Sequence, residues 1–154
     1  MSAGKFDFKE VRQLQKQITQ LEKDRDKFCE DCAKYLAARL LAKVIKRTPK
    51  DSGNLQRGWT AQGSGSGSEG LKTRGASQYI DTLKVNHFGD TYVIEIVNPV
   101  EYASYVEYGH RTANHKGWVP GKLMLTVSER QLQEQAPKML EKRISDYLKG
   151  AFHV

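Results

Sequence analysis

The chain has 154 residues and a net charge of +7 at pH 7, with 38% hydrophobic and 28% charged residues. This length supports one core of ordinary size, so we expect a single domain over residues 1–154 with a polar surface. No apolar run reaches the roughly 18 residues of a membrane span, and charge follows the first residues where a signal peptide would be apolar. We therefore expect no membrane partner and synthesis in the cytoplasm.

A long N-terminal helix is predicted from Phe8 to about Arg47, because this stretch has no proline or glycine and is rich in strong helix formers. The wholly charged stretch 22–27 is compatible with a break or a solvated turn. Apolar residues on either side of it form a narrow seam of Phe8, Val11, Leu14, Ile18, Leu21, Phe28, Cys32, Leu36, Leu40 and Val44. Such a seam cannot bury itself, so we expect residues 1–27 to form a helical arm that packs on another element or another subunit.

A basic stripe runs along the second half of this helix. Arg39, Lys43, Lys46 and Lys50 follow one another at steps of four, three and four residues, which places them on one helical face. Such a stripe can bind phosphates, and we take these four residues as possible DNA-facing positions. The alternative is an ordinary solvated face whose cations complement the negative end of the helix.

A turn, a strand and a long loop are expected next. The helix is expected to end within residues 48–54, because Pro49 disfavours helix at the residue before it and Asp51-Ser52-Gly53-Asn54 is typical of a turn. Leu55 to Ala61 is predicted to form a strand. Residues 62–78 contain five glycines and four serines, which predicts a flexible hairpin loop. Loops of this length are usually functional or disordered, so we expect a partner or neighbouring subunit to hold it.

The middle of the chain predicts a hairpin. Tyr79 to Phe88 and Thr91 to Asn98 are expected to form two strands joined at Gly89-Asp90, because apolar and polar residues alternate in the second of them. With the strand before the Gly/Ser segment, this gives a small antiparallel sheet of about three strands. The expected fold class is α+β, with this sheet and its long hairpin packed by the N-terminal helix, a short tyrosine-rich helix and a C-terminal helix.

The short tyrosine-rich helix lies between Pro99 and Gly109. Proline suits the first turn of a helix, and glycine is the residue that most often ends one. Tyr102, Tyr105 and Val106 recur at a spacing of three and four residues and therefore share a helix face, and Tyr108 extends this stripe. Tyrosines suit protein interfaces because the ring can be dry while the hydroxyl stays hydrogen-bonded. The alternative is that these rings only cover the domain's own sheet.

The last part of the chain is predicted to be a loop followed by a helix. Residues 109–121 form the loop, which carries Trp118, and Lys122 to Phe152 has a helical pattern. Pro137 marks a break or a kink in that helix.

No residue pattern points to catalysis or to a cofactor. Cys29 and Cys32 have the spacing of redox and metal motifs, but they lie inside a predicted helix without a second cysteine pair, so we expect two reduced, partly buried thiols. Glu101, Glu107 and His110 could act as acid and base groups, but the sequence supplies no nucleophile to go with them. We expect no enzymatic activity, no cofactor and no metal.

Three separated segments resemble one known family in order and spacing. Residues 47–59 (RTPKDSGNLQRGW) resemble the "RTPxDTGxLxxxW" segment of the neck and tail-completion proteins of tailed bacteriophages, the lambdoid minor tail-component family. Residues 98–111 are similar to that family's "N…YAxYVExGxR" signature, and residues 117–125 resemble its loop into the C-terminal helix. The resemblance covers about residues 8–150. Ser52 stands where threonine is commoner, and the Gly/Ser repeat exceeds the usual hairpin tip.

The resemblance implies a structural virion protein without catalytic residues. It would form a ring, commonly of six copies, at the head–tail junction, joining the portal or head-completion complex to the tail-tube or terminator proteins while genomic DNA passes through the lumen. It also implies a structural set and an interface set of residues. The turn and structural positions are Pro49, Asp51, Gly53, Leu55, Trp59, Pro99 and Gly109, and the interface candidates are Tyr102, Tyr105, Val106, Glu107, Tyr108, Arg111 and Trp118.

Two alternatives remain open. One is a tail terminator that caps the tail tube. The other is a small basic nucleic-acid-binding module that uses the stripe from Arg39 to Lys50. Single-strand binders interleave basic residues with stacking rings, whereas the tyrosines of this chain lie in a segment that contains Glu101 and Glu107.

Overall fold

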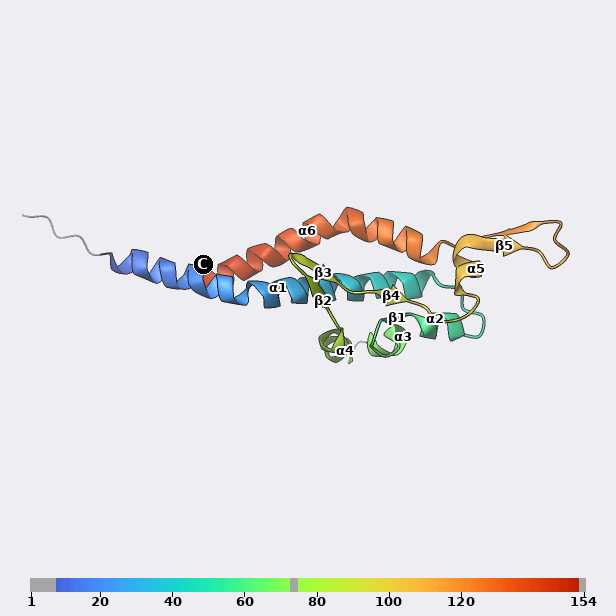
Figure 1. The fold of residues 1–154 in the computed structure, drawn as a ribbon, viewed down its shortest axis with the longest axis horizontal. Helices are drawn as coiled ribbons and strands as arrows, with labels where there is room; N and C mark the ends of the chain where they lie inside the picture. The colour runs from blue at the N-terminus through green and yellow to red at the C-terminus, as the bar shows by residue number, and fades with distance from the viewer. Residues whose placement is uncertain (1–7, 73–74, 153–154) are drawn as a thin grey trace, which may run out of the picture.

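The computed structural model describes residues 8–72 and 75–152. Two long helices, α1 (Lys9–Arg47) and α6 (Met124–Phe152), lie side by side and run antiparallel (Figure 1). Their direction follows from two hydrogen bonds: Arg47 Nη2 donates to Gln131 Oε1 (2.9 Å), and Tyr147 Oη donates to the carbonyl of Leu21 (3.2 Å). The two helices thus form the long axis of the molecule.

Both predicted long helices are present. The charged stretch 22–27 does not interrupt α1, because four of its six residues are good helix formers (Glu22, Lys23, Arg25 and Lys27) and i, i+4 contacts such as Lys27–Asp31 (3.4 Å) support it. The C-terminal helix continues through Pro137, so the break that this residue predicted is absent. Figure 1 shows α6 bowed away from α1, and a proline that removes one hydrogen bond inside a helix favours such a bend.

Shorter elements connect the two long helices. The contacts and Figure 1 place α1 between α6 and the elements α3 and α4, while α5, β5 and β6 lie at the end of the molecule where α1 finishes. In chain order these elements are α2 (Asn54–Gly58), β1 (Thr60–Ala61), α3 (Gly67–Gly70), α4 (Ala76–Thr82), β2 (Asn86–Phe88), β3 (Thr91–Val93), β4 (Ile96–Val97), α5 (Ala103–Tyr108), β5 (Gly109–Arg111) and β6 (Trp118–Pro120).

The α+β class is confirmed, but the predicted sheet of about three strands is wrong. The described strands form three separate antiparallel pairs, β1–β4, β2–β3 and β5–β6. The hairpin turn at Gly89-Asp90 is confirmed by the pairing of Phe88 with Thr91. The second predicted strand is divided, because residues 91–93 pair with β2 and residues 96–97 pair with β1. The pair β5–β6 lies where a loop was predicted.

Helices replace two predicted strands. Residues 54–58 are helical where a strand over 55–61 was expected, and residues 76–82 are helical where loop and strand were expected. The reason is burial at helical spacing: Leu55 and Trp59 are both buried four residues apart, and so are Tyr79 and Leu83. The Gly/Ser segment 62–78 also contains α3, and its residues 73–74 lie outside the described residues.

The hydrophobic core lies in the half of the molecule where α1 ends. Leu41, Val44, Ala61 and Met124 are fully inaccessible to solvent, and Trp59 packs with them. The core therefore joins α1 to β1 and to the first turn of α6. Cys32 is buried and Cys29 half-buried, both as free thiols, as the sequence predicted.

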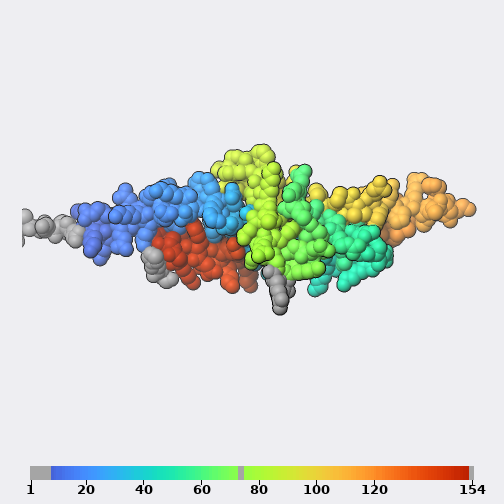
Figure 2. Space-filling model, turned by 90° about the horizontal axis from the view of Figure 1, so that it is seen from below, coloured from blue at the N-terminus to red at the C-terminus, as the bar shows by residue number. Residues whose placement is uncertain are grey.

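The other end of α1 projects beyond the rest of the described chain as an arm (Figures 1 and 2). Near the base of the arm, α6 contacts α1 through the Tyr147–Leu21 hydrogen bond and the stacked rings of Tyr147 and Phe28, whose centroids lie 4.1 Å apart. Upstream of them, the apolar side chains of Val11, Leu14 and Ile18 are exposed. The predicted arm spans residues 1–27, of which 1–7 lie outside the described residues.

The β2–β3 hairpin is attached to α1 through a phenol. Tyr92 Oη donates a hydrogen bond to Asp26 Oδ1 (2.9 Å), and the Tyr92 ring stacks on His87 with a centroid distance of 4.2 Å. Desolvation, followed by the hydrogen bond to Asp26 and the negative charge of that residue, raises the pKa of Tyr92 from 10.0 to about 12.

We predict that this contact is lost at alkaline pH. Because the folded-state pKa of Tyr92 is raised, the stabilisation is fully present below pH 10.0 and is lost as the pH rises through about 12. An absorbance titration of the tyrosines should show a late transition that is smaller in Tyr92→Phe and earlier in Asp26→Asn. Burial also raises the pKa of Tyr147. This tyrosine is present in the wild type and in every variant compared. Tyr108→Phe is the control; a late transition that is equal in Tyr92→Phe and wild type would contradict the assignment.

Candidate interaction surface

The end of α1 is closed by side chains from the segment 47–59. Thr48 Oγ1 donates to the carbonyl of Val44 (2.7 Å) and accepts a hydrogen bond from Trp59 Nε1 (2.8 Å). Gln56 Nε2 donates to the carbonyls of Ile45 (3.1 Å) and Thr48 (3.2 Å). Carbonyls in the last turn of a helix lack partners within the helix, so these side chains satisfy them and fix the turn against α1.

Asn98 locks this segment to the chain that leads into α5. Its Nδ2 donates to the carbonyl of Leu55 (2.8 Å), and its Oδ1 accepts from the backbone N–H of Val100 (3.2 Å). A side chain at Gly58 would collide with those of Asn98 and Val100, so glycine is required for this close approach. Gly53, with φ of 79°, allows the left-handed turn that starts α2.

Glu107 joins α5 to α6. Its carboxylate is buried and accepts three hydrogen bonds from the first turn of α6: Oε2 from the N–H of Leu125 (2.9 Å), and Oε1 from the N–H (2.9 Å) and the hydroxyl (2.7 Å) of Thr126. The N–H groups of a first helical turn have no partner within the helix, and that end carries a partial positive charge. Glu107 therefore acts as an N-terminal cap supplied by another helix.

Gly109 brings the chain back on itself. Its φ is 89°, and a Cβ atom there would lie 2.5 Å from the carbonyl oxygen of Val119. The strands β5 and β6 can therefore pair, and the backbone N–H groups of Lys122 and Leu123 donate to the carbonyls of Val106 (2.7 Å) and Glu107 (3.0 Å). The loop into α6 thus lies flat against α5.

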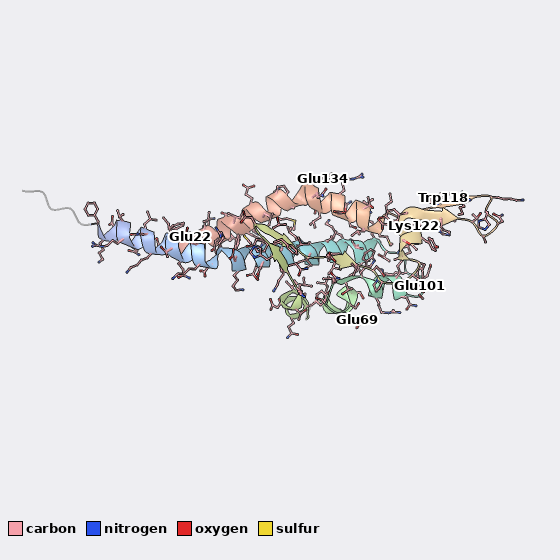
Figure 3. All side chains as sticks on the ribbon, in the orientation of Figure 1. Glu22, Glu69, Glu101, Trp118, Lys122 and Glu134 are labelled. Atoms are coloured by element: carbon pink, nitrogen blue, oxygen red, sulfur yellow. The ribbon has the colours of Figure 1, made fainter. Side chains whose placement is uncertain are left out.

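These bonds hold a surface of exposed apolar side chains at one end of the molecule, which we call the aromatic surface. It consists of side chains that are 39–68% exposed, namely Tyr102, Tyr105, Tyr108, Trp118, Val119 and Leu123. Figure 3 shows Trp118 on the hairpin that extends from this end. Next to these residues lies a groove of about 370 Å³ between the turn at 49–55, α5 and β6, and Leu55 and Val106 form part of its lining.

The predicted interface and turn residues fall into two groups. Tyr102, Tyr105, Tyr108 and Trp118 belong to the aromatic surface, Arg111 is exposed on β5, and Val106 is half-buried in the groove. Glu107, in contrast, points into the chain. Among the turn residues, Pro49, Asp51, Gly53 and Leu55 line the groove, Trp59 is in the core, Pro99 is exposed and Gly109 begins β5. Val119 was missed because the predicted loop gave no periodicity, and Leu123 because it was assigned to the start of the C-terminal helix.

Three of the four predicted DNA-facing residues lie together. Arg39, Lys43 and Lys46 line a groove of about 510 Å³ between α1 and α6, whereas Lys50 is exposed in the turn that follows α1. Arg47 also lines this groove. An adjoining groove, which shares Arg39 with the first, is lined by Lys138, Lys142 and Arg143 of α6. The four-residue spacing of Lys138 and Lys142 could have indicated this second basic face.

Within the described residues, no three His, Cys, Asp or Glu side chains are grouped so that they could hold a metal ion. In the same part of the chain, every helix is too short or too polar to span a membrane.

Residues 12–109, more than half of the chain, match the model of a protein family described as "Bacteriophage HK97-gp10, putative tail-component". This match confirms the resemblance and includes the first motif and most of the second, while the segment 117–125 lies outside it. No curated protein and no solved structure matches the chain.

Removing the Glu107 carboxylate should loosen the start of α6. We expect Glu107→Ala to lower the free energy of unfolding by about 2 to 4 kcal/mol, because a cap is lost and two helix N–H groups are left unsatisfied. Glu107→Gln keeps part of the hydrogen bonding and should lose less. Urea denaturation at one fixed protein concentration measures the change. Glu101→Ala, on an exposed residue of the same segment, should stay within about 0.5 kcal/mol of wild type; equal losses for both alanine variants would refute the capping role.

Proposed function

We propose that this chain, which belongs to the family of the bacteriophage HK97 gp10 tail component, is a structural subunit that assembles into a ring at the head–tail junction of the virion. The observation that carries the proposal is the aromatic surface. A phage tail component must bind other structural proteins, and this surface is the part of the described chain where exposed aromatic side chains gather.

The composition of the aromatic surface suits a protein interface. Tyrosine and tryptophan are enriched at the centres of interfaces and dominate their binding energy. The backbone beneath them is fixed by the bonds of Thr48, Asn98 and Glu107. A surface that is already ordered loses little conformational entropy when a partner binds, so more of the contact energy appears as affinity.

The polar residues of the motifs support a structural role over an enzymatic one. Thr48, Asn98 and Glu107 each form hydrogen bonds to backbone groups of their own chain, so their donors and acceptors are occupied within the fold. We therefore propose that the protein has no catalytic activity and requires no cofactor.

The ring would contact other proteins on both of its sides. We propose six copies, with the portal or head-completion complex on one side, tail-tube or terminator proteins on the other, and genomic DNA passing through the lumen. A subunit that uses two different surface patches to bind copies of itself forms a closed ring when the rotation between copies closes. A tail terminator that caps the tube would use the same kind of ring.

The test is the loss of assembly when the aromatic surface is truncated. Tyr105→Ala combined with Trp118→Ala should convert the oligomer into smaller species by light scattering, and phage that carry the pair should yield unjoined heads and tails by electron microscopy. Gln133→Ala, on the exposed face of α6, is the control for a surface truncation. An unchanged oligomer and normal virions for the double variant would show that the aromatic surface is not an interface.

The basic groove between α1 and α6 favours nucleic-acid binding as a second candidate function. Its two adjoining hollows are lined by seven cationic side chains and only two carboxylates, those of Glu134 and Asp146. Within the described part of the chain, the ion pairs present, Arg25–Asp26 and Lys27–Asp31, involve none of these cations. Unneutralised cations along a groove attract the phosphates of a nucleic-acid backbone.

A salt titration of binding to labelled duplex DNA tests this candidate. Lys43→Gln combined with Lys46→Gln should weaken binding and reduce the slope of log K against log salt by about 2, since each lysine accounts for about one phosphate contact. Lys84→Gln with Lys149→Gln removes the same charge outside the groove and should leave the slope closer to wild type. Equal effects of the two pairs would mean that the groove is not the binding site.

A further inference from the structure

Most of the exposed large apolar side chains of the described residues lie in two groups at opposite ends of the molecule, the arm and the aromatic surface, while Phe88, Val97, Ile144 and Leu148 are exposed elsewhere. We infer that the N-terminal arm of one copy docks in the groove beside the aromatic surface of the next copy. Figures 1 and 2 show the arm at one end of the elongated molecule, and α5 with the β5–β6 hairpin at the other end. The inference rests on the proposed self-association and names the two surfaces that meet.

The arm has the form of a ready-made ligand. Val11, Leu14 and Ile18 recur at steps of three and four residues, so they form one apolar stripe, and they are 46–60% exposed. Gln15 and Gln17 lie beside the stripe, so its immediate neighbours on those sides are uncharged. The arm is the continuation of the 39-residue helix α1, and docking would therefore not have to fold a new helix.

The groove beside the aromatic surface has the form of a receptor for such a helix. Its cavity of about 370 Å³ has apolar or aromatic lining from Pro49, Leu55, Tyr102, Tyr105, Val106, Val119 and Pro120, and polar lining from Asp51, Ser52, His110 and Lys122. An amphipathic helix that lays apolar residues at i, i+3 and i+7 into an apolar groove is a common mode of peptide recognition. The convex stripe and the concave groove are thus complementary in shape and in polarity.

Pairing of two arms is the weaker alternative. The stripe from Val11 to Ile18 covers about 10 Å, or two helical turns. Coiled coils need apolar repeats sustained over about three or four heptads, so an arm–arm pair would be too short to be stable.

A second apolar groove on the same molecule is also a weaker receptor. It measures about 580 Å³ and lies between α1, α6 and β3. Phe28, Leu36, Leu40 and Ile94 in its lining are already half-buried and Ile144 is 45% exposed, whereas Tyr102 and Tyr105 in the lining of the first groove are 41% and 59% exposed. Apolar association is favoured in proportion to the area removed from water, so the aromatic surface gains more from a partner.

Contact between opposite ends gives a head-to-tail interface. Each copy then offers its arm to one neighbour and its groove to another, and one repeated contact covers both apolar ends. Tyr105, one of the two residues truncated in the Tyr105/Trp118 double variant, is part of the lining of the receptor groove.

Photo-crosslinking identifies the site that the arm contacts. We would replace Leu14 with the photoreactive residue p-benzoylphenylalanine, mix isotopically light and heavy copies of the assembled protein, and identify the linked peptides by mass spectrometry. The expected cross-links join position 14 of one copy to residues 49–55 or 99–123 of another. Cross-links to residues 28–40, 90–96 or 132–144, to a second arm, or none at all would overturn the inference.

A pair of charge substitutions measures the contribution of the stripe. Leu14→Asp with Ile18→Asp should weaken self-association by about tenfold or more in sedimentation equilibrium, because two carboxylates would enter an apolar groove. Lys16→Asp, at an exposed position on the opposite face of the same arm, should leave it near wild type. If the stripe variant still assembles while the Tyr105/Trp118 variant does not, the arm is not the ligand and the proposed function stands. If both variants assemble, the proposed function fails as well.

Discussion

The contact between Glu107 and the first turn of α6 is the one on which the arrangement of this protein depends. A carboxylate that is 6% exposed is stable only where hydrogen bonds replace the lost water, and here the three donors all come from Leu125 and Thr126. The same residue lies at the end of α5, directly before Tyr108 and Gly109. The direction of α6, and with it the groove that α6 forms with α1, is therefore fixed relative to the aromatic surface.

The motif residues divide by chemistry into those that hold the backbone and those that face outward. Thr48, Asn98 and Glu107 satisfy helix ends or loop backbone, while Tyr105 and Trp118 leave most of their area exposed. This division explains why acidic and amide residues lie close together without forming a catalytic group, since their acceptors and donors are occupied by the fold. What the motif segments offer to another molecule is mainly apolar area on a rigid frame.

Parts of this structure follow from local sequence, and parts do not. The bounds of α1 could be predicted because no glycine or proline interrupts residues 9–47, and α5 because Pro99 and Gly109 enclose it. The helices at 54–58 and 76–82 were missed, although Leu55/Trp59 and Tyr79/Leu83 carried the helical spacing. Strands of two or three residues give too short a pattern to detect, and their pairing depends on tertiary contacts such as the approach of Gly109 to Val119. The basic groove needs α1 and α6 together: the spacing of Lys138 and Lys142 could have indicated the α6 face as the stripe indicated the α1 face, but local sequence does not show that the two faces meet.

The distribution of buried area explains why this fold suits an assembly. The core around Leu41, Val44 and Met124 lies where α1 ends, and the described strands form only isolated pairs, which are marginally stable without further packing. The arm and the β5–β6 hairpin extend away from that core in opposite directions. A chain whose exposed apolar side chains lie on segments that extend from its core gains most from neighbours that cover those segments. Because the two ends differ in shape, one convex and one concave, contact between them favours a directional array of copies over a two-fold pair.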